Sequence, residues 1–227
     1  MWKWLVAVVL VLVVWLVVLP LRQVTRFIAP ELTSTEISGS IWKGRLANAE
    51  WRGVALGDLE VALDPRALLD GDVRLDFKRG ASELTGRLGT GNGRHVAERL
   101  NGRVRVPLKS SLATDLDVTL ENAEISIDAA GQCQKASGQV ATRLSGIPGL
   151  GTSPVLSGVV RCDDGALLLP LRSSDDTVGL DVRLWADRRY RADVTVKTTS
   201  MVVRLAMTAA GFTTAPDEAR RTFEGRL

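Results

Sequence analysis

The two cysteines, Cys133 and Cys162, are the residues with the clearest chemistry in this 227-residue chain. Both lie on short segments with the alternating pattern of β-strands, so the two side chains could pair across a sheet. A disulfide suits a protein exported to an oxidising compartment, and closing this loop would stabilise the fold by about 3–4 kcal/mol. The alternative is a pair of buried thiols.

The other polar residues form no catalytic or metal-binding pattern. His95 is the only histidine, and two cysteines alone are not a zinc signature. Asp163-Asp164 and Asp175-Asp176 lie in predicted turns, where calcium binding and plain solvent exposure are the two interpretations. The glycine-rich stretch Gly89–Gly93 lacks the helix and lysine of a phosphate-binding loop, and no G-x-S-x-G motif is present. We therefore predict no catalytic residue, no metal site, no cofactor and no enzymatic activity.

Charge excludes one further class of function. The net charge is +3, and 29 basic residues are interleaved with 26 acidic ones. No stretch gathers Lys and Arg with aromatic residues, so we expect no nucleic acid partner.

The N-terminus predicts a membrane anchor. Residues 4–21 carry no charge, and eighteen helical residues span roughly 27 Å, close to the thickness of the bilayer core. Residues 1–3 would form a short cytoplasmic tail. Trp2, Trp4 and Trp15 are candidate interface residues. A cleaved signal peptide is the alternative, although no small-x-small cleavage site follows Leu21.

Orientation is nearly balanced by charge, because Lys3 precedes the anchor while Arg22 and Arg26 follow it. Large domains cross membranes largely regardless of their charge. Together with the candidate disulfide, this favours export of the long C-terminal part.

From Glu36 onward, apolar residues recur at every second position in short runs, as in Asp72–Lys78 and Asp115–Glu121. This period predicts antiparallel strands with one dry and one wet face. We expect an all-β fold of curved sheets, either an open trough or an open sandwich. Its predicted parts, in order along the chain, are a connector (22–35), a first β lobe (36–144), a loop (145–154) and a second β lobe (155–227).

Helical signals are few. Pro65–Leu69 follows Asp64, a favourable N-cap, and forms the best candidate. Arg94–Leu100 and Pro216–Arg220 are two further short candidates. Val202–Thr208 is a weaker strand candidate.

A glycine followed two residues later by an aliphatic residue recurs at irregular spacing. Glycine at such positions permits bends, bulges and close crossing of strands. The glycines concerned are Gly39, Gly44, Gly86, Gly102, Gly138, Gly158 and Gly225.

The stretch around Gly39, Trp42, Gly44 and Trp51 predicts a strand pair, Glu36–Lys43 and Leu46–Arg52, which would bring the two tryptophans near one another. They either lock the first meander or form a docking surface for a partner.

These residues, with Leu59–Gly71, Gly165–Leu169 and Asp187–Tyr190, resemble the type II secretion system protein N family over nearly the whole chain. In the last segment, Arg stands where the family pattern has glycine. The resemblance implies a single-span protein of the Gram-negative inner membrane with a short cytoplasmic N-terminus and a periplasmic β domain. It implies association with other components of the secretion machinery, whose inner-membrane platform proteins are the expected partners and work with an outer-membrane secretin, a further candidate partner. It carries no catalytic signature.

Two functions follow as expectations. The first is a structural or adaptor subunit of type II secretion. The alternative is a lipid-binding or lipid-transfer module, since similar glycine-punctuated sheets occur in AsmA-like envelope proteins. That link is an analogy of fold.

Overall fold

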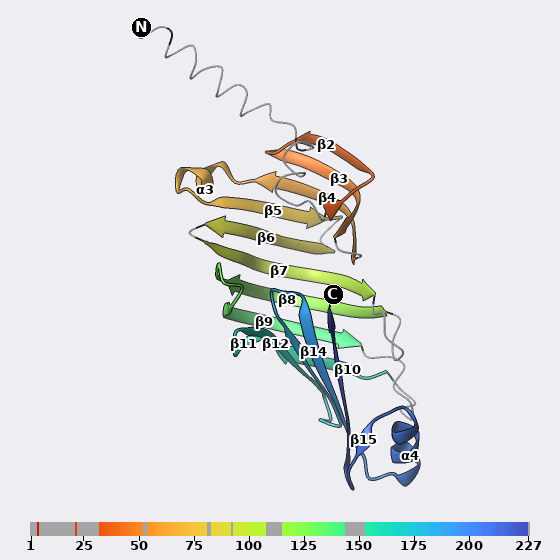
Figure 1. The fold of residues 1–227 in the computed structure, drawn as a ribbon. Coiled ribbons are helices and arrows are strands. Elements are labelled where there is room, and N and C mark those ends of the chain that lie inside the picture. The colour runs from red at the N-terminus through yellow and green to blue at the C-terminus, as the bar shows by residue number, and fades with distance from the viewer. Residues whose placement is uncertain are drawn as a thin grey trace.

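A long, curved antiparallel sheet makes up most of the molecule (Figure 1). The computed structural model describes residues 4, 21, 32–51, 54–80, 83–91, 93–107, 115–143 and 153–226. Within these, sixteen strands join one sheet. The predicted all-β class is therefore confirmed.

In chain order, the strands and helices are β1 (Leu32–Thr33), β2 (Glu36–Ser40), β3 (Lys43–Trp51), β4 (Val54–Leu63), α3 (Pro65–Leu69), β5 (Val73–Arg79), β6 (Leu84–Gly91), β7 (Arg94–Pro107), β8 (Asp115–Ile127), β9 (Cys133–Arg143), β10 (Val155–Val159), β11 (Arg161–Asp163), β12 (Ala166–Ser173), β13 (Val178–Leu184), β14 (Arg189–Lys197), α4 (Met201–Ala209), β15 (Thr213–Thr214) and β16 (Glu218–Arg226).

Strand order follows chain order almost throughout. From β3 to β10 each strand pairs with the next, and the path continues through β12, β13, β14 and β16 to β15. The sheet is continuous across the two predicted lobes, because β10 pairs with β9 in a register that places Val155 opposite Arg143. β1 lies within the segment that we expected to be a connector.

One of the three predicted helices is confirmed. α3 begins after Asp64, whose carboxylate accepts a hydrogen bond from the Arg66 backbone N–H at 3.0 Å. The second candidate, Arg94–Leu100, is wrong: these residues belong to β7, which pairs with β6 and β8 on its two sides. Pairing on both edges outweighs the weak helix propensity of this segment.

The two C-terminal expectations are also corrected. Pro216–Arg220 is not a helix, because β16 begins at Glu218 and pairs with β14. Val202–Thr208 is not a strand but part of α4, which starts after the N-cap Ser200. Met207 of α4 is completely buried in the hydrophobic core, and Val203 packs against the same core. The two residues are four positions apart, so they lie on one face of a helix.

Trp42 and Trp51 are separated by the length of β3. Trp42 lies in the turn before β3, whereas Trp51 is its last residue, opposite Val54 of β4. Nine strand residues extend about 30 Å. The prediction that Trp42 and Trp51 lie near one another is therefore wrong.

The core forms two separate clusters. The N-terminal cluster is built from residues around β3 and β4, with Leu46 the most deeply buried leucine there. The C-terminal cluster joins Val140 of β9 to Leu156 of β10, Val194 of β14 and Met207 of α4. Such a cluster requires the sheet to curl, and Figure 1 shows β14 and β16 crossing in front of β8 and β9.

The recurring glycines explain how the sheet curls. An ideal Cβ built on any of them would lie between 2.0 and 2.8 Å from a neighbouring atom. Real Cβ atoms essentially never approach so closely. The strand registers place each glycine on the face that carries the two core clusters, which we call the inner face. The missing side chains let neighbouring backbone and side chains approach on that face.

The predicted anchor, residues 4–21, falls mostly outside the described residues, as do Trp2 and Trp15. Trp4 is described, and 79% of its surface is exposed. Among the described residues, no helix has both the length and the apolar character that crossing a bilayer requires.

Candidate binding surfaces

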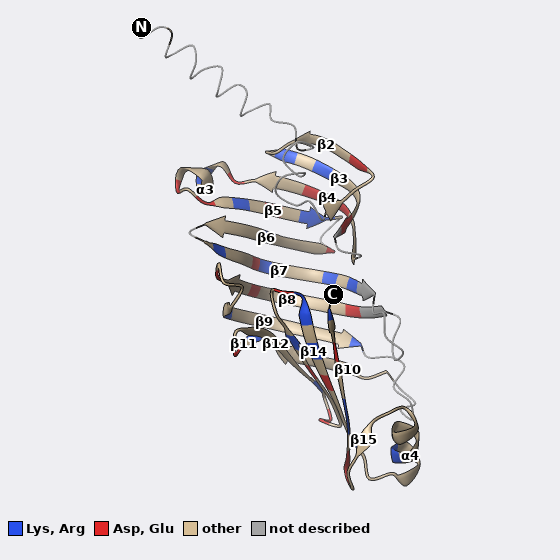
Figure 2. Ribbon diagram, viewed as in Figure 1, with Lys and Arg blue, Asp and Glu red and all other residues tan. Residues whose placement is uncertain are grey.

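The outer face of the sheet is polar and carries ion pairs that cross from strand to strand. Arg45 is the strand partner of Glu60, and its guanidinium lies 2.9 Å from the Glu60 carboxylate. Arg87 is the strand partner of Asp76, and its guanidinium lies 2.6 Å from the Asp76 carboxylate. Opposite charges therefore face one another across neighbouring strands, and Figure 2 shows both basic and acidic residues distributed over the sheet. Exposed pairs of this kind contribute at most about 1 kcal/mol each. Because its charged side chains are paired and exposed to water, this face is a polar, solvated surface.

The densest part of this network surrounds Asp193 of β14. Its carboxylate accepts a hydrogen bond from Thr222 at 2.6 Å and lies 3.2 Å from the Arg191 guanidinium. Burial alone would raise the pKa of Asp193, but the hydrogen bonds from Thr222 and Arg191 outweigh it and lower that pKa. Because its pKa is lowered, this carboxylate is only a weak general base near neutral pH, and it carries no proton to donate as a general acid.

The inner face is apolar along the sheet. The registers place Leu46 opposite Leu59, Leu75 opposite Leu88, and continue through later strands in the same manner. Further members of this face are Val61, Phe77, Val104, Val118, Leu120, Val140, Leu156, Leu171, Leu180 and Val194.

The middle of the inner face is only partly covered. Leu88 is 47% exposed, and Leu100 and Val104 are half-buried. None of these three side chains belongs to either core cluster. Apolar surface therefore remains accessible between the two clusters, over β6 and β7.

Gly44 makes room for Leu21 at the N-terminal end of the sheet. An ideal Cβ on Gly44 would stand 2.3 Å from Leu21 Cδ2, and Leu21 is buried in the N-terminal cluster. Trp42 is half-buried and packs against the same cluster. Gly39, Trp42 and Gly44 also line an open groove of about 550 Å³ with Val61 and Phe77, and both a structural and a docking role of this motif stay predictions.

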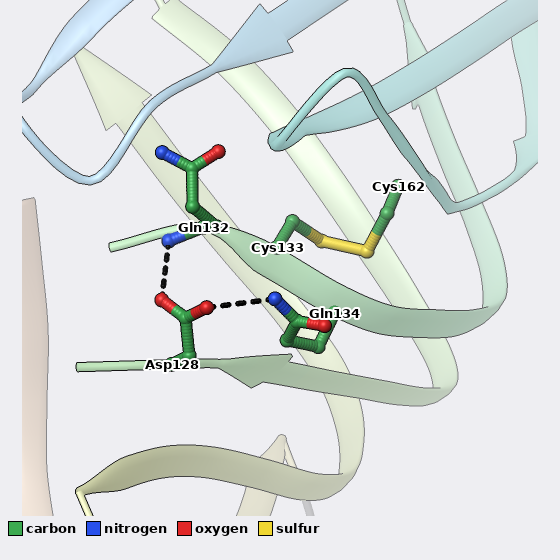
Figure 3. Close-up of a disulfide and its surroundings, with 5 residues drawn as sticks. All are labelled: Asp128, Gln132, Cys133, Gln134 and Cys162. Carbon is green, nitrogen blue, oxygen red and sulfur yellow. Dashed lines mark hydrogen bonds between the residues drawn. A yellow bond between two sulfur atoms is a disulfide. The ribbon is translucent and has the colours of Figure 1, made fainter. Parts of the chain in front are cut away.

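Cys133 and Cys162 are joined by a disulfide, with their Cα atoms 5.5 Å apart (Figure 3). The bond ties the start of β9 to β11. Beside it, Asp128 accepts hydrogen bonds from the backbone N–H groups of Ala130 and Gln132 and from the Gln134 side chain. The hydrogen bond from the Gln132 backbone is the largest cause of the lowered pKa of Asp128. The loop between β8 and β9 is therefore held in one conformation next to the disulfide.

Sequence reasoning missed an exposed apolar face on α4. Met201, Val202 and Leu205 are 79%, 79% and 72% exposed, and Thr208 and Ala209 continue the same side of the helix. Side chains at these spacings share one helix face. The face carries no charge. Apolar surface of this kind marks interaction sites on soluble domains.

The described residues show no constellation for catalysis or metal binding. Within them, no group of three or more His, Cys, Asp and Glu side chains lies close enough to hold a metal ion. Asp175, in one of the two candidate turns, instead accepts hydrogen bonds from Ser173 and Thr177, which lower its pKa to about 2. This geometry closes a turn between β12 and β13.

Comparison with known proteins gives a consistent result. The family model described as "Type II secretion system (T2SS), protein N" matches residues 30–222. A protein of Vibrio cholerae serotype O1 named "Type II secretion system protein N" is 38% identical over 60 residues. That alignment covers 26% of this chain and 24% of the relative. No solved structure matches.

Proposed function

Since this chain belongs to the type II secretion system protein N family, we propose that it is an accessory, non-catalytic subunit of a type II secretion system. The observation that carries this proposal is the family match, which extends from residue 30 to residue 222 and so includes nearly every described strand. The subunit acts by binding other components through its β domain.

Two features of the structure support a binding role. The exposed apolar face of α4 is suited to a protein partner, because it pairs large apolar side chains with no compensating charge. The disulfide ties β9 to β11 and so stabilises the sheet where the C-terminal strands begin.

The location proposed for the chain follows from the sequence. Residues 4–21 anchor it in the inner membrane, with residues 1–3 in the cytoplasm, and the β domain lies in the periplasm. An oxidising compartment is consistent with the disulfide between Cys133 and Cys162. Cysteine-accessibility labelling at residues 2 and 110 in intact and permeabilised cells tests this topology.

Purification of the tagged full-length chain from solubilised envelopes tests the function. Secretion components, including platform proteins or the secretin, are expected to co-purify, and deleting the chain is expected to reduce secretion. Normal secretion in the deletion strain, with no component recovered, contradicts the proposal.

A variant of α4 sharpens this experiment. Replacing Met201 and Leu205 together by Ser removes exposed apolar surface and leaves the buried Met207 in place. Recovery of partners should fall at least several-fold while the melting temperature stays within a few degrees. The matched control is Val159→Ser, which alters an exposed valine on β10, well away from α4 in the sheet order.

A second candidate function is lipid binding, favoured by the accessible apolar surface over β6 and β7. Acyl chains could lie on Leu88, Leu100 and Val104. Mass spectrometry of the purified protein should then detect co-purifying lipid in the wild type and much less in Val104→Asp. Absence of lipid from the wild type rejects this candidate.

A further inference from the structure

The last long strand, β16, has an unpaired edge. On one side β14 pairs with it along its whole length, from Arg226 opposite Arg189 to Glu218 opposite Lys197. On the other side β15 pairs only with Ala219 and Arg220. Within the part of the chain that the structure describes, no strand pairs with this side of β16 beyond Arg220.

Two hydrogen bonds determine which backbone groups face the unpaired edge. The Ala215 N–H donates to the Glu218 carbonyl at 2.6 Å, so the backbone of Glu218 faces β15. The Thr198 N–H donates to the Asp217 carbonyl at 2.9 Å, so the neighbouring residue faces β14. Backbone groups alternate along a strand, and the register with β14 is unbroken. The N–H and C=O groups of Thr222, Glu224 and Arg226 therefore point to the unpaired edge.

Two of the features that usually prevent strand addition, proline and a β-bulge, are absent from this edge. Residues 221–226 contain no proline, and no bulge interrupts their pairing with β14. Such edges are templates for pairing with another chain. A groove of about 660 Å³ lies over β15 and the first part of β16 and reaches the start of the unpaired edge at Thr222.

The side chains of β16 define the chemistry of an added strand. Thr222, Glu224 and Arg226 are exposed on the outer face. Phe223 is half-buried on the inner face, where it packs against the C-terminal cluster and lies 4.6 Å from the Arg221 guanidinium. A strand added here needs an apolar residue beside Phe223, and it needs charges opposite in sign to Glu224 and Arg226.

A second copy of this chain fits this requirement poorly. The antiparallel register that uses all three unpaired residues places Thr222 opposite Arg226 of the copy. It also places Glu224 directly opposite Glu224 of the copy. Like charges directly opposite one another destabilise a strand pair.

We propose that β16 binds an extended segment of another secretion component, added as a strand along Thr222–Arg226. The segment alternates apolar and polar residues, with a basic residue opposite Glu224 and an acidic residue opposite Arg226. This inference rests on the proposed function, because it names a second surface, besides the apolar face of α4, through which a secretion component is held.

The test compares Glu224→Pro with Glu224→Ala in the full-length chain. Proline removes the Glu224 N–H, which faces the unpaired edge and not β14, so the fold tolerates it as edge strands do. Alanine removes the same side chain and keeps the N–H. Co-purification of the secretion component should fall at least tenfold with Glu224→Pro and at most about threefold with Glu224→Ala. Equal recovery with wild type and Glu224→Pro overturns the inference.

Backbone amide exchange in the wild type provides a second measurement that needs no variant. In the purified complex, exchange at Thr222, Glu224 and Arg226 should slow at least tenfold relative to the chain alone. The amides of Arg221, Phe223 and Gly225 already face β14 and should change little. Unchanged exchange at the first three amides overturns the inference, as does their protection in a homodimer. Failure of the wild type to recover any secretion component instead contradicts the proposed function itself.

Discussion

Gly158 of β10 and Pro170 of β12 approach so closely that a Cβ on Gly158 would stand 2.0 Å from the Pro170 carbonyl oxygen. The obstacle is backbone, which cannot rotate away. We expect Gly158→Ala to destabilise the protein by about 1–3 kcal/mol, as overpacking of a core does. Urea unfolding followed by circular dichroism measures the change.

Gly89→Ala is the matched control. Gly89 also lies in a strand, but the nearest atom to its ideal Cβ is 3.8 Å away. This variant should stay within about 0.5 kcal/mol of the wild type. Equal destabilisation by the two variants would show that loss of glycine itself, and not the close approach, is responsible.

Removing the disulfide should destabilise the fold. The two cysteines are 29 residues apart, and closing a loop of that length stabilises by about 3–4 kcal/mol. The Cys133→Ser/Cys162→Ser variant should therefore melt well below the oxidised wild type. Reductant should lower the melting temperature of the wild type only; an equal response of the variant contradicts the assignment.

Acid stability should depend on Asp175. Its pKa is lowered from 3.8 to about 2 by hydrogen bonds from Ser173 and Thr177, so the unfolded chain takes up the proton at higher pH than the folded chain. The stabilisation is present above about pH 4 and is lost as the pH falls toward 2. Melting temperatures between pH 6 and pH 2 should decline less steeply in Asp175→Asn than in the wild type.

We expect Trp42 to stabilise the fold and not to bind a partner. It packs against the N-terminal cluster from the turn before β3. Trp42→Ala should cost about 2–4 kcal/mol, near the lower end for deletion of a large aromatic because the side chain is only half-buried, and Trp42→Phe should cost less. Loss of partner binding in Trp42→Ala with an unchanged melting temperature would assign it a docking role instead.

Local sequence patterns predict the strands well where both faces of the sheet are clearly distinguished. Asp72–Lys78 and Asp115–Glu121 alternate without interruption; β5 begins at Val73 and includes the rest of the first run, and β8 includes the whole of the second. The recurring glycines also carry correct information, because each lies on the inner face where a Cβ would collide with a neighbouring atom. The alternating period is a local property that a sequence can record.

The sequence predictions that were wrong concern segments whose conformation is determined by tertiary contacts. Arg94–Leu100 has helix-forming residues, yet strands on both sides determine its conformation. The α4 segment has the local pattern of a strand because Val202 and Val203 favour strands, while burial of Met207 depends on contacts that are distant in sequence. The unpaired edge of β16 has no sequence signal, since it depends on where β15 ends.

The strand order has a consequence for biosynthesis. Because nearly every strand pairs with its predecessor in the chain, a polypeptide emerging N-terminus first can add each hairpin to a sheet that already exists. Among the described strands, no early one has to wait unpaired for a partner that is made much later. When the sheet forms strand by strand in chain order, β16 is the last long strand to join it.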